Sequence, residues 1–144
     1  NQKIKKAIGK PLPVSSKDGL LKTDFKVELG KVSYHVPCHL RVQNVGKKTA
    51  ETLQMIPGTE VNVVERCSGH AGTWGVKKEF HEMAMKIGKP VFKNMASTEP
   101  DYISSDCQLA GHHISQGMEE NNLKKSQMAH PITLLAKAYG LTSN

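Results

Sequence analysis

Strand-like and helix-like segments alternate along this chain after residue 30, and this order constrains the fold more than any other feature. Residues 31–36 alternate between polar and apolar side chains, residues 60–65 are rich in valine, and residues 102–105 form a third short strand-like segment. Apolar side chains recur at helical spacing in residues 46–56, 76–95, 114–120 and 131–139. Gly88 and Pro90 are expected to kink or split the second of these helices. The alternation predicts an α/β fold, with an open, mainly parallel sheet and helices on its faces in βαβαβα order.

Residues 1–30 differ from the rest of the chain and are predicted to be a linker or lead-in segment. They are polar and contain Pro11 and Pro13, with one short strand expected at residues 25–29. Residues 31–144 are then the domain, and their number suits a single hydrophobic core. The first residue is asparagine and no signal-peptide pattern follows it, so we expect a fragment of a longer polypeptide. No apolar run approaches the about 20 residues that a membrane span needs.

The chain is basic, and its positive charge is spread along the sequence. It has 20 Lys and Arg residues against 13 Asp and Glu residues, which gives a formal net charge of +7. The lysines form isolated pairs, such as Lys77 with Lys78 and Lys124 with Lys125, with no arginine-rich run and no basic strand interleaved with aromatic residues. A solubilising surface is therefore favoured over a nucleic-acid site, and no nucleic-acid partner is expected.

Three cysteines follow the three predicted strands. Cys38, Cys67 and Cys107 each come just after a strand, in contexts rich in glycine, histidine or proline. Their odd number argues against a secreted disulfide scaffold and favours a reducing compartment, the cytoplasm. Because the carboxyl ends of parallel strands meet at one edge of a sheet, the three thiols are expected to converge there. Converging thiolates suit a soft metal or an iron–sulfur cluster.

The segment after Cys67 is rich in glycine. Gly69 and Gly72 would let the backbone approach a bulky cofactor closely. Their N–H groups, with those at the start of the following helix, could also offset the charge of the thiolates. We therefore include both glycines among the predicted cofactor-binding residues.

Three blocks around the cysteines carry a family resemblance. They read YHVPCHL at residues 34–40, CSGHAGTW at 67–74 and DCQLA at 106–110, and the tail HPITLLA at 130–136 extends the likeness. They resemble the cysteine-rich CCG domain of heterodisulfide reductase, in its B subunit, and of iron–sulfur oxidoreductases like the C subunit of anaerobic glycerol-3-phosphate dehydrogenase. The resemblance covers residues 31–141, and this segment is similar to the C-terminal copy of the domain in longer chains.

The resemblance implies an iron–sulfur electron-transfer domain that belongs to an oxidoreductase, as a domain or subunit. Its partners would be other subunits or domains: a flavin dehydrogenase, a ferredoxin-type domain, and a quinone or thiol acceptor. The complex would lie in the cytoplasm or at the inner face of the membrane. No catalytic side chain is predicted on this chain, because no hydrolase elbow, phosphate loop or dinucleotide fingerprint occurs.

The chain departs from the family's full motif at two positions. Ser68 replaces the second cysteine of Cys-Cys-Gly, and Ala110 replaces the last cysteine of Cys-x-x-Cys. Five ligands thus become three, too few for a noncubane cluster. Three thiolates could hold a cubane 4Fe-4S cluster with one open or non-cysteine corner, or zinc with a histidine. They could also bind no metal, with two thiols cycling through a disulfide, or the domain could be a cluster-free structural and assembly module.

Histidines near the cysteines are candidates for a fourth ligand. His39 and His70 are best placed, since each lies within three residues of a cysteine, and His35, His112 and His113 are within reach. For each histidine taken singly, a hydrogen-bonding role beside the site is favoured over ligation. Three further residues are expected to have other roles: His81 on the surface, His130 at the start of the last helix, and Trp74 packed against the sheet.

Overall fold

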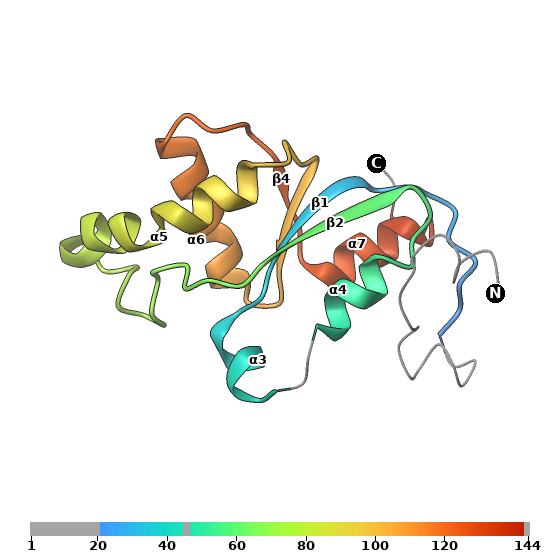
Figure 1. Cartoon of the computed structure of the whole chain (residues 1–144), viewed down its shortest axis with the longest axis horizontal. Helices are drawn as coiled ribbons and strands as arrows, with labels where there is room; N and C mark the ends of the chain where they lie inside the picture. The colour runs from blue at the N-terminus through green and yellow to red at the C-terminus, as the bar shows by residue number, and fades with distance from the viewer. Residues whose placement is uncertain (1–20, 45–46, 143–144) are drawn as a thin grey trace.

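The computed structural model describes residues 21–44 and 47–142, which form one α/β layer structure (Figure 1). Four strands make a single, entirely parallel sheet in the order β2-β1-β3-β4. The strands are β1 (Gly30–His35), β2 (Thr59–Val64), β3 (Tyr102–Ser105) and β4 (Gln127–Met128). The helices are α3 (Cys38–Val42), α4 (Lys48–Leu53), the 3₁₀ turn η1 (Lys78–Phe80), α5 (His81–Ala96), α6 (Gln108–Glu120) and α7 (Pro131–Ala138). The predicted fold class is therefore confirmed.

The three strands that precede the cysteines, β1, β2 and β3, end level with one another. The central strand β1 pairs along its whole length with β2, and its last four residues, from Val32 to His35, pair with β3. In this register His35 lies opposite both Val64 and Ser105, the last residues of β2 and β3. The chain segments that leave the three strands therefore start from the same edge of the sheet.

Helices cover both faces of the sheet, as parallel strands require. On one face α4 and α7 enclose a core that includes Val32, Tyr34, Leu53 and Leu134. On the other face α5 and α6 pack on each other around Phe92, over strands β2 and β3. Figure 1 shows the pair α5 and α6 apart from the pair α4 and α7, with the strands between them. None of the helices within the described ranges is long and apolar enough to cross a lipid bilayer.

Several element boundaries differ from the sequence expectation. The expected strand at residues 25–29 does not form, because the N–H groups of Lys26 and Val27 donate to the carbonyl of Ala138 at the end of α7. Phe25 stacks on Tyr139 in the same contact. These residues therefore extend the α7 side of the core and do not join the sheet. The remaining part of the predicted lead-in, residues 1–20, lies outside the described residues.

Helix α5 runs without a break through Gly88 and Pro90, so the expected split is wrong. Proline leaves the carbonyl four residues earlier, on Lys86, without an intrahelical partner. Lys86 and Pro90 are both exposed, so water can hydrogen-bond that carbonyl. Gly88 is buried, and a Cβ atom there would lie 2.5 Å from the Ser68 carbonyl oxygen. The glycine thus allows the loop after β2 to pack closely on this helix.

Candidate functional site

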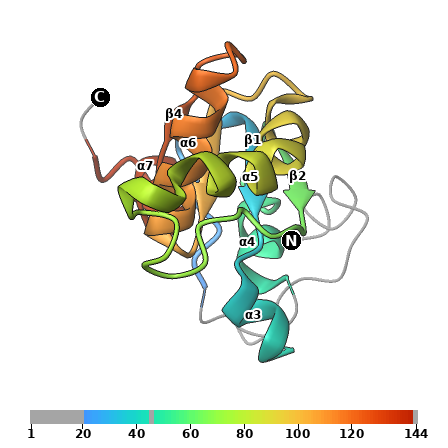
Figure 2. The same ribbon diagram turned by 90° about the vertical axis from the view of Figure 1, so that its left-hand side faces the viewer.

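The three cysteines follow their strands closely but sit in different local structures. Cys38 is the first residue of α3, three residues after β1, and Arg41 on the same helix donates to its sulfur at 3.5 Å. Cys67 lies in the loop after β2, and Cys107 is the residue before the first turn of α6. Cys38 and Cys67 are exposed, whereas Cys107 is partly buried. Helix α3 projects from the end of β1, away from α5 and α6 (Figures 1 and 2).

The described residues do not bring the three thiols into one metal-binding group. Within residues 21–44 and 47–142, no three His, Cys, Asp or Glu side chains gather closely enough to hold a metal ion. The structure does bring Cys107 and His70 together, with 3.9 Å between the sulfur and Nε2. Convergence of all three thiols at the sheet edge therefore stays a prediction.

His70 connects Cys107 to a buried serine. The hydroxyl of Ser68 lies 2.7 Å from Nδ1 of His70, and Ser68 is only 1% exposed. Burial lowers the pKa of His70, which favours the neutral imidazole. The Ser68–His70–Cys107 chain thus joins the loop after β2 to the start of α6. A neutral imidazole held at one nitrogen leaves its other nitrogen able to bind a thiol proton or a metal.

The two glycines predicted to approach a cofactor have different surroundings. Gly69 is buried with a φ of 89°, and a Cβ atom there would lie 2.5 Å from the Ala84 carbonyl oxygen on α5. Gly72 is exposed with a φ of 63°, and a Cβ atom there would meet nothing within 4 Å. Close packing of the loop on α5 accounts for the glycine at 69. A cofactor-binding role for either glycine stays a prediction.

His35 links the segments that precede two of the cysteines. It is 1% exposed, its Nε2 donates to the Arg66 carbonyl at 2.8 Å, and its Nδ1 lies 3.2 Å from the Ser105 hydroxyl. The same hydroxyl accepts from the backbone N–H of Cys107 at 3.3 Å. Burial lowers the pKa of His35, only partly opposed by the bond to Arg66, so the ring stays neutral. Sequence reasoning placed His35 within reach of the site but missed that it ties the Cys67 and Cys107 segments together.

A second link involves the residue next to Cys107. The Tyr34 hydroxyl donates to one oxygen of the Asp106 carboxylate, and the Thr49 hydroxyl donates to the other at 3.3 Å. Burial, followed by the hydrogen bond to Asp106, raises the pKa of Tyr34. Nothing in the sequence pattern indicated this contact, because residues 34 and 106 are far apart along the chain and meet only through the pairing of β1 with β3.

The other histidines fall into exposed and buried groups. His39 and His112 are exposed on α3 and α6, and His81 is a partly exposed residue that lies 3.3 Å from the Glu120 carboxylate. His113 is 7% exposed, with its ring edge against Phe92, and its buried Nε2 has no hydrogen-bond partner among the described residues. His130 accepts from the Ile132 N–H and caps α7, as expected.

Trp74 does not pack against the sheet as predicted. It is half-buried, and its ring stacks on Phe80 with the two centroids 4.8 Å apart. This contact lies between the loop after β2 and η1 because Gly75 folds back on His70, whose carbonyl accepts from the Gly75 N–H at 2.7 Å.

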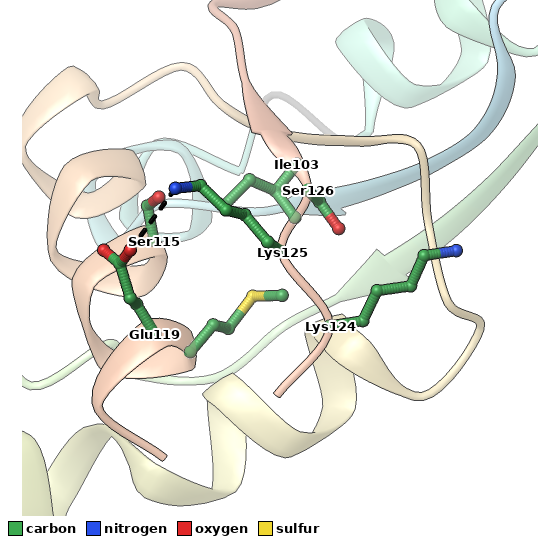
Figure 3. A pocket seen from close by; sticks show the side chains of 7 residues that line it. Ile103, Ser115, Glu119, Lys124, Lys125 and Ser126 are labelled. Atoms are coloured by element: carbon green, nitrogen blue, oxygen red, sulfur yellow. Dashed lines mark hydrogen bonds and ion pairs between the residues drawn. The ribbon is translucent and has the colours of Figure 1, made fainter. Parts of the chain in front are cut away.

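A shallow pocket lies at the far end of α6 from the cysteines (Figure 3). It is lined by Ser115 and Glu119 of α6 and by residues 124–126, and Lys125 lies 3.4 Å from the Glu119 carboxylate. The lining residue Glu119 is twelve positions after Cys107 on α6, which puts their Cα atoms about 18 Å apart along the helix axis, and none of the three cysteines lines the pocket. It is therefore not part of the candidate site.

Comparison with known proteins places the chain among cysteine-rich domains. The CCG family, described as a cysteine-rich domain, matches residues 32–115, more than half of the chain. The C subunit of anaerobic glycerol-3-phosphate dehydrogenase from Escherichia coli is 37% identical over 109 residues, 75% of this chain and 26% of the relative.

Two archaeal relatives are similar over comparable lengths. An uncharacterized iron–sulfur protein from Methanocaldococcus jannaschii is 32% identical over 126 residues, 83% of this chain and 25% of the relative. The B subunit of fumarate reductase (CoM/CoB) from Methanothermobacter marburgensis is 32% identical over 113 residues, 76% of this chain and 23% of the relative. The chain thus spans about a quarter of the length of these relatives. No solved structure was found that matches it.

Proposed function

Because this chain belongs to the CCG family of cysteine-rich domains, we propose that it is an iron–sulfur electron-transfer domain of an oxidoreductase. The observation that carries the proposal is that three cysteines leave the level ends of three adjacent parallel strands. The proposed ligands are Cys38, Cys67 and Cys107. Two relatives whose names describe them as an iron–sulfur protein and as part of a dehydrogenase support the redox assignment.

The chemical type of the three side chains fits an iron–sulfur cluster, although the described residues do not bring the three sulfur atoms into one group. Thiolates are the usual ligands of such clusters, and all three cysteines are free. Cys38 and Cys67 are exposed, so neither side chain is packed inside a hydrophobic core. When bound, the cluster would supply transfer of single electrons at a potential that its ligands and hydrogen bonds set.

The chain's own residues have defined roles in this proposal. Cys107 stands at the N-terminus of the 13-residue helix α6, where the helix dipole favours negative charge such as that of a bound cluster. His35 and Ser105 hold the backbone on which Cys107 sits. We propose a 4Fe-4S cluster on the three cysteines, with Gly69 and Gly72 lining it.

The wider setting is also a proposal. Residues 31–144 would be the cluster-bearing domain and residues 1–30 its lead-in, the end of which, from Phe25 to Leu29, packs on the domain's core. A flavin dehydrogenase, a ferredoxin-type domain, and a quinone or thiol acceptor would be its partners, in a complex in the cytoplasm or bound to the inner face of the membrane. Two relatives are named as subunits, one of a dehydrogenase and the other of a reductase, which supports such partners.

The test is anaerobic reconstitution of the full chain with iron and sulfide. We expect about four irons and four sulfides per chain, with a reducible EPR signal. Cys38→Ala, Cys67→Ala and Cys107→Ala should each lower the iron content sharply. Val42→Ala is the matched control, since it changes an exposed apolar residue on the same short helix as Cys38. Unchanged iron content in all three cysteine variants would contradict the proposal.

A cluster-free assembly domain is the second candidate. It is favoured by the lack of a three-ligand metal group among the described residues. It predicts a stable fold without iron, whose melting temperature is indifferent to iron and to chelators. Near-stoichiometric zinc without visible absorption would instead identify a structural zinc site.

A further inference from the structure

Strand β2 forms one edge of the sheet, and we infer that this edge is the docking surface for a second copy of the chain. The two β2 strands would pair antiparallel across a two-fold axis and join the two sheets into one. The inference goes beyond the proposed function, since it does not depend on a bound cluster. It starts from the strand order, in which β2 has β1 as its only neighbour among the described residues (Figure 2).

The hydrogen bonds of β2 show which backbone groups face the open edge. The Val64 carbonyl accepts from the Val36 N–H at 2.9 Å, and the Arg66 carbonyl accepts from the ring of His35. The even-numbered residues thus direct their backbone groups toward β1, because successive residues of a strand use opposite sides. The odd-numbered residues, Val61, Val63 and Glu65, therefore present their N–H and C=O groups to the open edge.

The sequence of this edge lacks the features that usually prevent strand addition. Exposed edge strands are normally interrupted by proline, by lysine or by a bulge. Residues 59–66 read TEVNVVER, without proline, glycine or lysine, and β2 pairs with β1 over all six of its residues without a bulge. Val61 and Val63 are only partly buried, so an added strand would remove more of their apolar surface from water.

A hollow beside β2 leaves room for the side chains of an added strand. Its volume is about 430 Å³, and it is lined by residues 62–66 together with Asn94 and Ser97 of α5. Even-numbered side chains of β2 point to this side of the sheet, since Asn62 donates to the Asn94 carbonyl at 3.1 Å. The corresponding side chains of a second β2 strand would lie over the same hollow.

Charge complementarity favours a second copy of this chain and selects one register. Glu60 and Arg66 are exposed, and neither forms an ion pair within residues 21–44 and 47–142. A two-fold axis at Val63 places Glu60 of each copy opposite Arg66 of the other, since both lie three positions from residue 63. Opposite charges that face each other across two strands stabilise their pairing.

The same register also pairs the backbone groups of the open edge. Val63 lies opposite Val63 of the second copy, and Val61 lies opposite Glu65, so outward-facing residues meet outward-facing residues. An axis at residue 62 or 64 would keep this match of the backbone but would lose both ion pairs. The charges therefore distinguish the register at Val63 from its neighbours.

Charge reversal tests the docking surface and its register. A dimer of Glu60→Arg would place arginine opposite arginine, and a dimer of Arg66→Glu would place glutamate opposite glutamate. Each change turns two attractive pairs into two repulsive pairs, so each should raise the dimer Kd by about 10–100-fold. In an equimolar mixture of the two variants, opposite charges meet again in the mixed dimer, and its Kd should return to the wild-type value. Glu82→Arg is the matched control, because it reverses an exposed charge on α5 and should leave the Kd unchanged.

Sedimentation equilibrium of the metal-free full chain measures these Kd values. A reductant keeps the exposed Cys38 and Cys67 from cross-linking. Salt at about 0.15 M screens the repulsion between two chains that each carry a formal net charge of +7. A wild-type chain that stays monomeric over the whole concentration series would overturn the inference. A dimer that neither reversal weakens, or a mixture of the two variants that stays monomeric, would also overturn it.

Amide hydrogen exchange followed by NMR tests the backbone pairing in the wild type, so it does not depend on the folding of any variant. The amides of Val61, Val63 and Glu65 should gain protection as the protein concentration rises. The amides of Asn62 and Val64 already bond to β1 and should not change. Protection of the first three amides that is complete in the monomer would show that the edge is covered within one chain, and would overturn the inference. Since both measurements use the metal-free chain, such a failure leaves the proposed function standing.

Discussion

The hydroxyl of Tyr34 at the end of β1 donates a hydrogen bond to the carboxylate of Asp106, the residue immediately before Cys107. Strand β1 therefore anchors the segment that follows β3 and carries Cys107. This contact can be broken with little change in side-chain volume, which makes it the first target.

Tyr34→Phe should lower the free energy of unfolding by about 1.5–3 kcal/mol, since it removes a hydrogen bond to a charged group. Urea unfolding of the metal-free chain measures the change. Tyr102→Phe is the matched control, because that half-buried ring makes its contact through its face, 5.2 Å from the Lys137 ammonium. The control should change stability by less than about 0.5 kcal/mol. Equal losses in the two variants would contradict the role assigned to the Tyr34 hydroxyl.

His35→Phe should destabilise the chain by about 1–3 kcal/mol, because it leaves the Arg66 carbonyl and the Ser105 hydroxyl without the imidazole. It should also speed hydrogen exchange in residues 65–68 and 105–108, while residues 38–42 stay unchanged. Exchange followed by mass spectrometry measures all three segments. The exposed His39 serves as the control, and His39→Phe should leave all three segments as in the wild type. Protection that survives in His35→Phe would rule out the proposed link.

Buried histidines should make the metal-free chain sensitive to acid. Burial lowers the pKa of His35, His70 and His113. The folded state then binds fewer protons than the unfolded state, whose histidines have a pKa of about 6.5. Their contribution to stability is thus present above that pH and is lost as pH falls through the folded-state pKa values. The urea concentration at the unfolding midpoint should therefore decrease as the pH is lowered from 7.5 to 5.

His113→Gln isolates one of these groups. The fall in urea midpoint between pH 7.5 and pH 5 should be smaller than in the wild type, since one buried imidazole no longer resists protonation. His112→Gln is the neighbouring control on the same helix, and its exposed side chain should leave the pH dependence unchanged. The same pH dependence in both variants would show that His113 does not titrate as its burial implies.

Gly69 and Gly72 provide a matched pair in the loop after β2. Both have positive φ, which costs an alanine about 1–2 kcal/mol. At Gly69 the new Cβ would also press on the Ala84 carbonyl oxygen, which adds about 1–3 kcal/mol of overpacking. Gly69→Ala should therefore lose about 2–5 kcal/mol and Gly72→Ala only the smaller amount. Denaturant unfolding distinguishes them, and equal losses would contradict close packing of the loop on α5.

The sheet was predictable because its strands carry their own pattern. The third strand was placed at residues 102–105, where β3 lies, and the other two were placed within one residue of β1 and β2. Helix α3 was missed, since the five residues CHLRV bury no side chain and show no apolar face. Strand β4 was missed because its pairing depends on backbone bonds, such as Gln127 N–H to the Asp101 carbonyl, that no side-chain pattern encodes.

Helix α6 was predicted at residues 114–120 but begins at Gln108. Gly111 and Gly117 lower the helix propensity of this segment, yet both are packing positions. A Cβ at Gly117 would lie 2.2 Å from the Phe92 ring, so only glycine lets α6 lie this close to α5. That tertiary reason is invisible in a single sequence.

Less of the candidate site than of the sheet could be predicted from the sequence. Strand order placed the three cysteines near one edge, because register follows from the parallel sheet. Strand order could not give the distances between the thiols, since those depend on how the chain turns after each of the three strands. Cys38 is the first residue of a helix that projects outward (Figure 2), whereas the Cys107 sulfur lies 3.9 Å from Nε2 of His70.

Tyr34 and His35 are neighbours on the central strand, so their side chains leave opposite faces of the sheet. One holds Asp106 on the α4 side, and the other holds Arg66 and Ser105 on the α5 side. These two adjacent residues therefore hold the segments that precede Cys67 and Cys107, with one hydrogen-bonding residue on each face of the sheet. Heat or chemical damage that loosens the end of β1 would release both, so the segments that carry Cys67 and Cys107 should lose their structure as one cooperative unit.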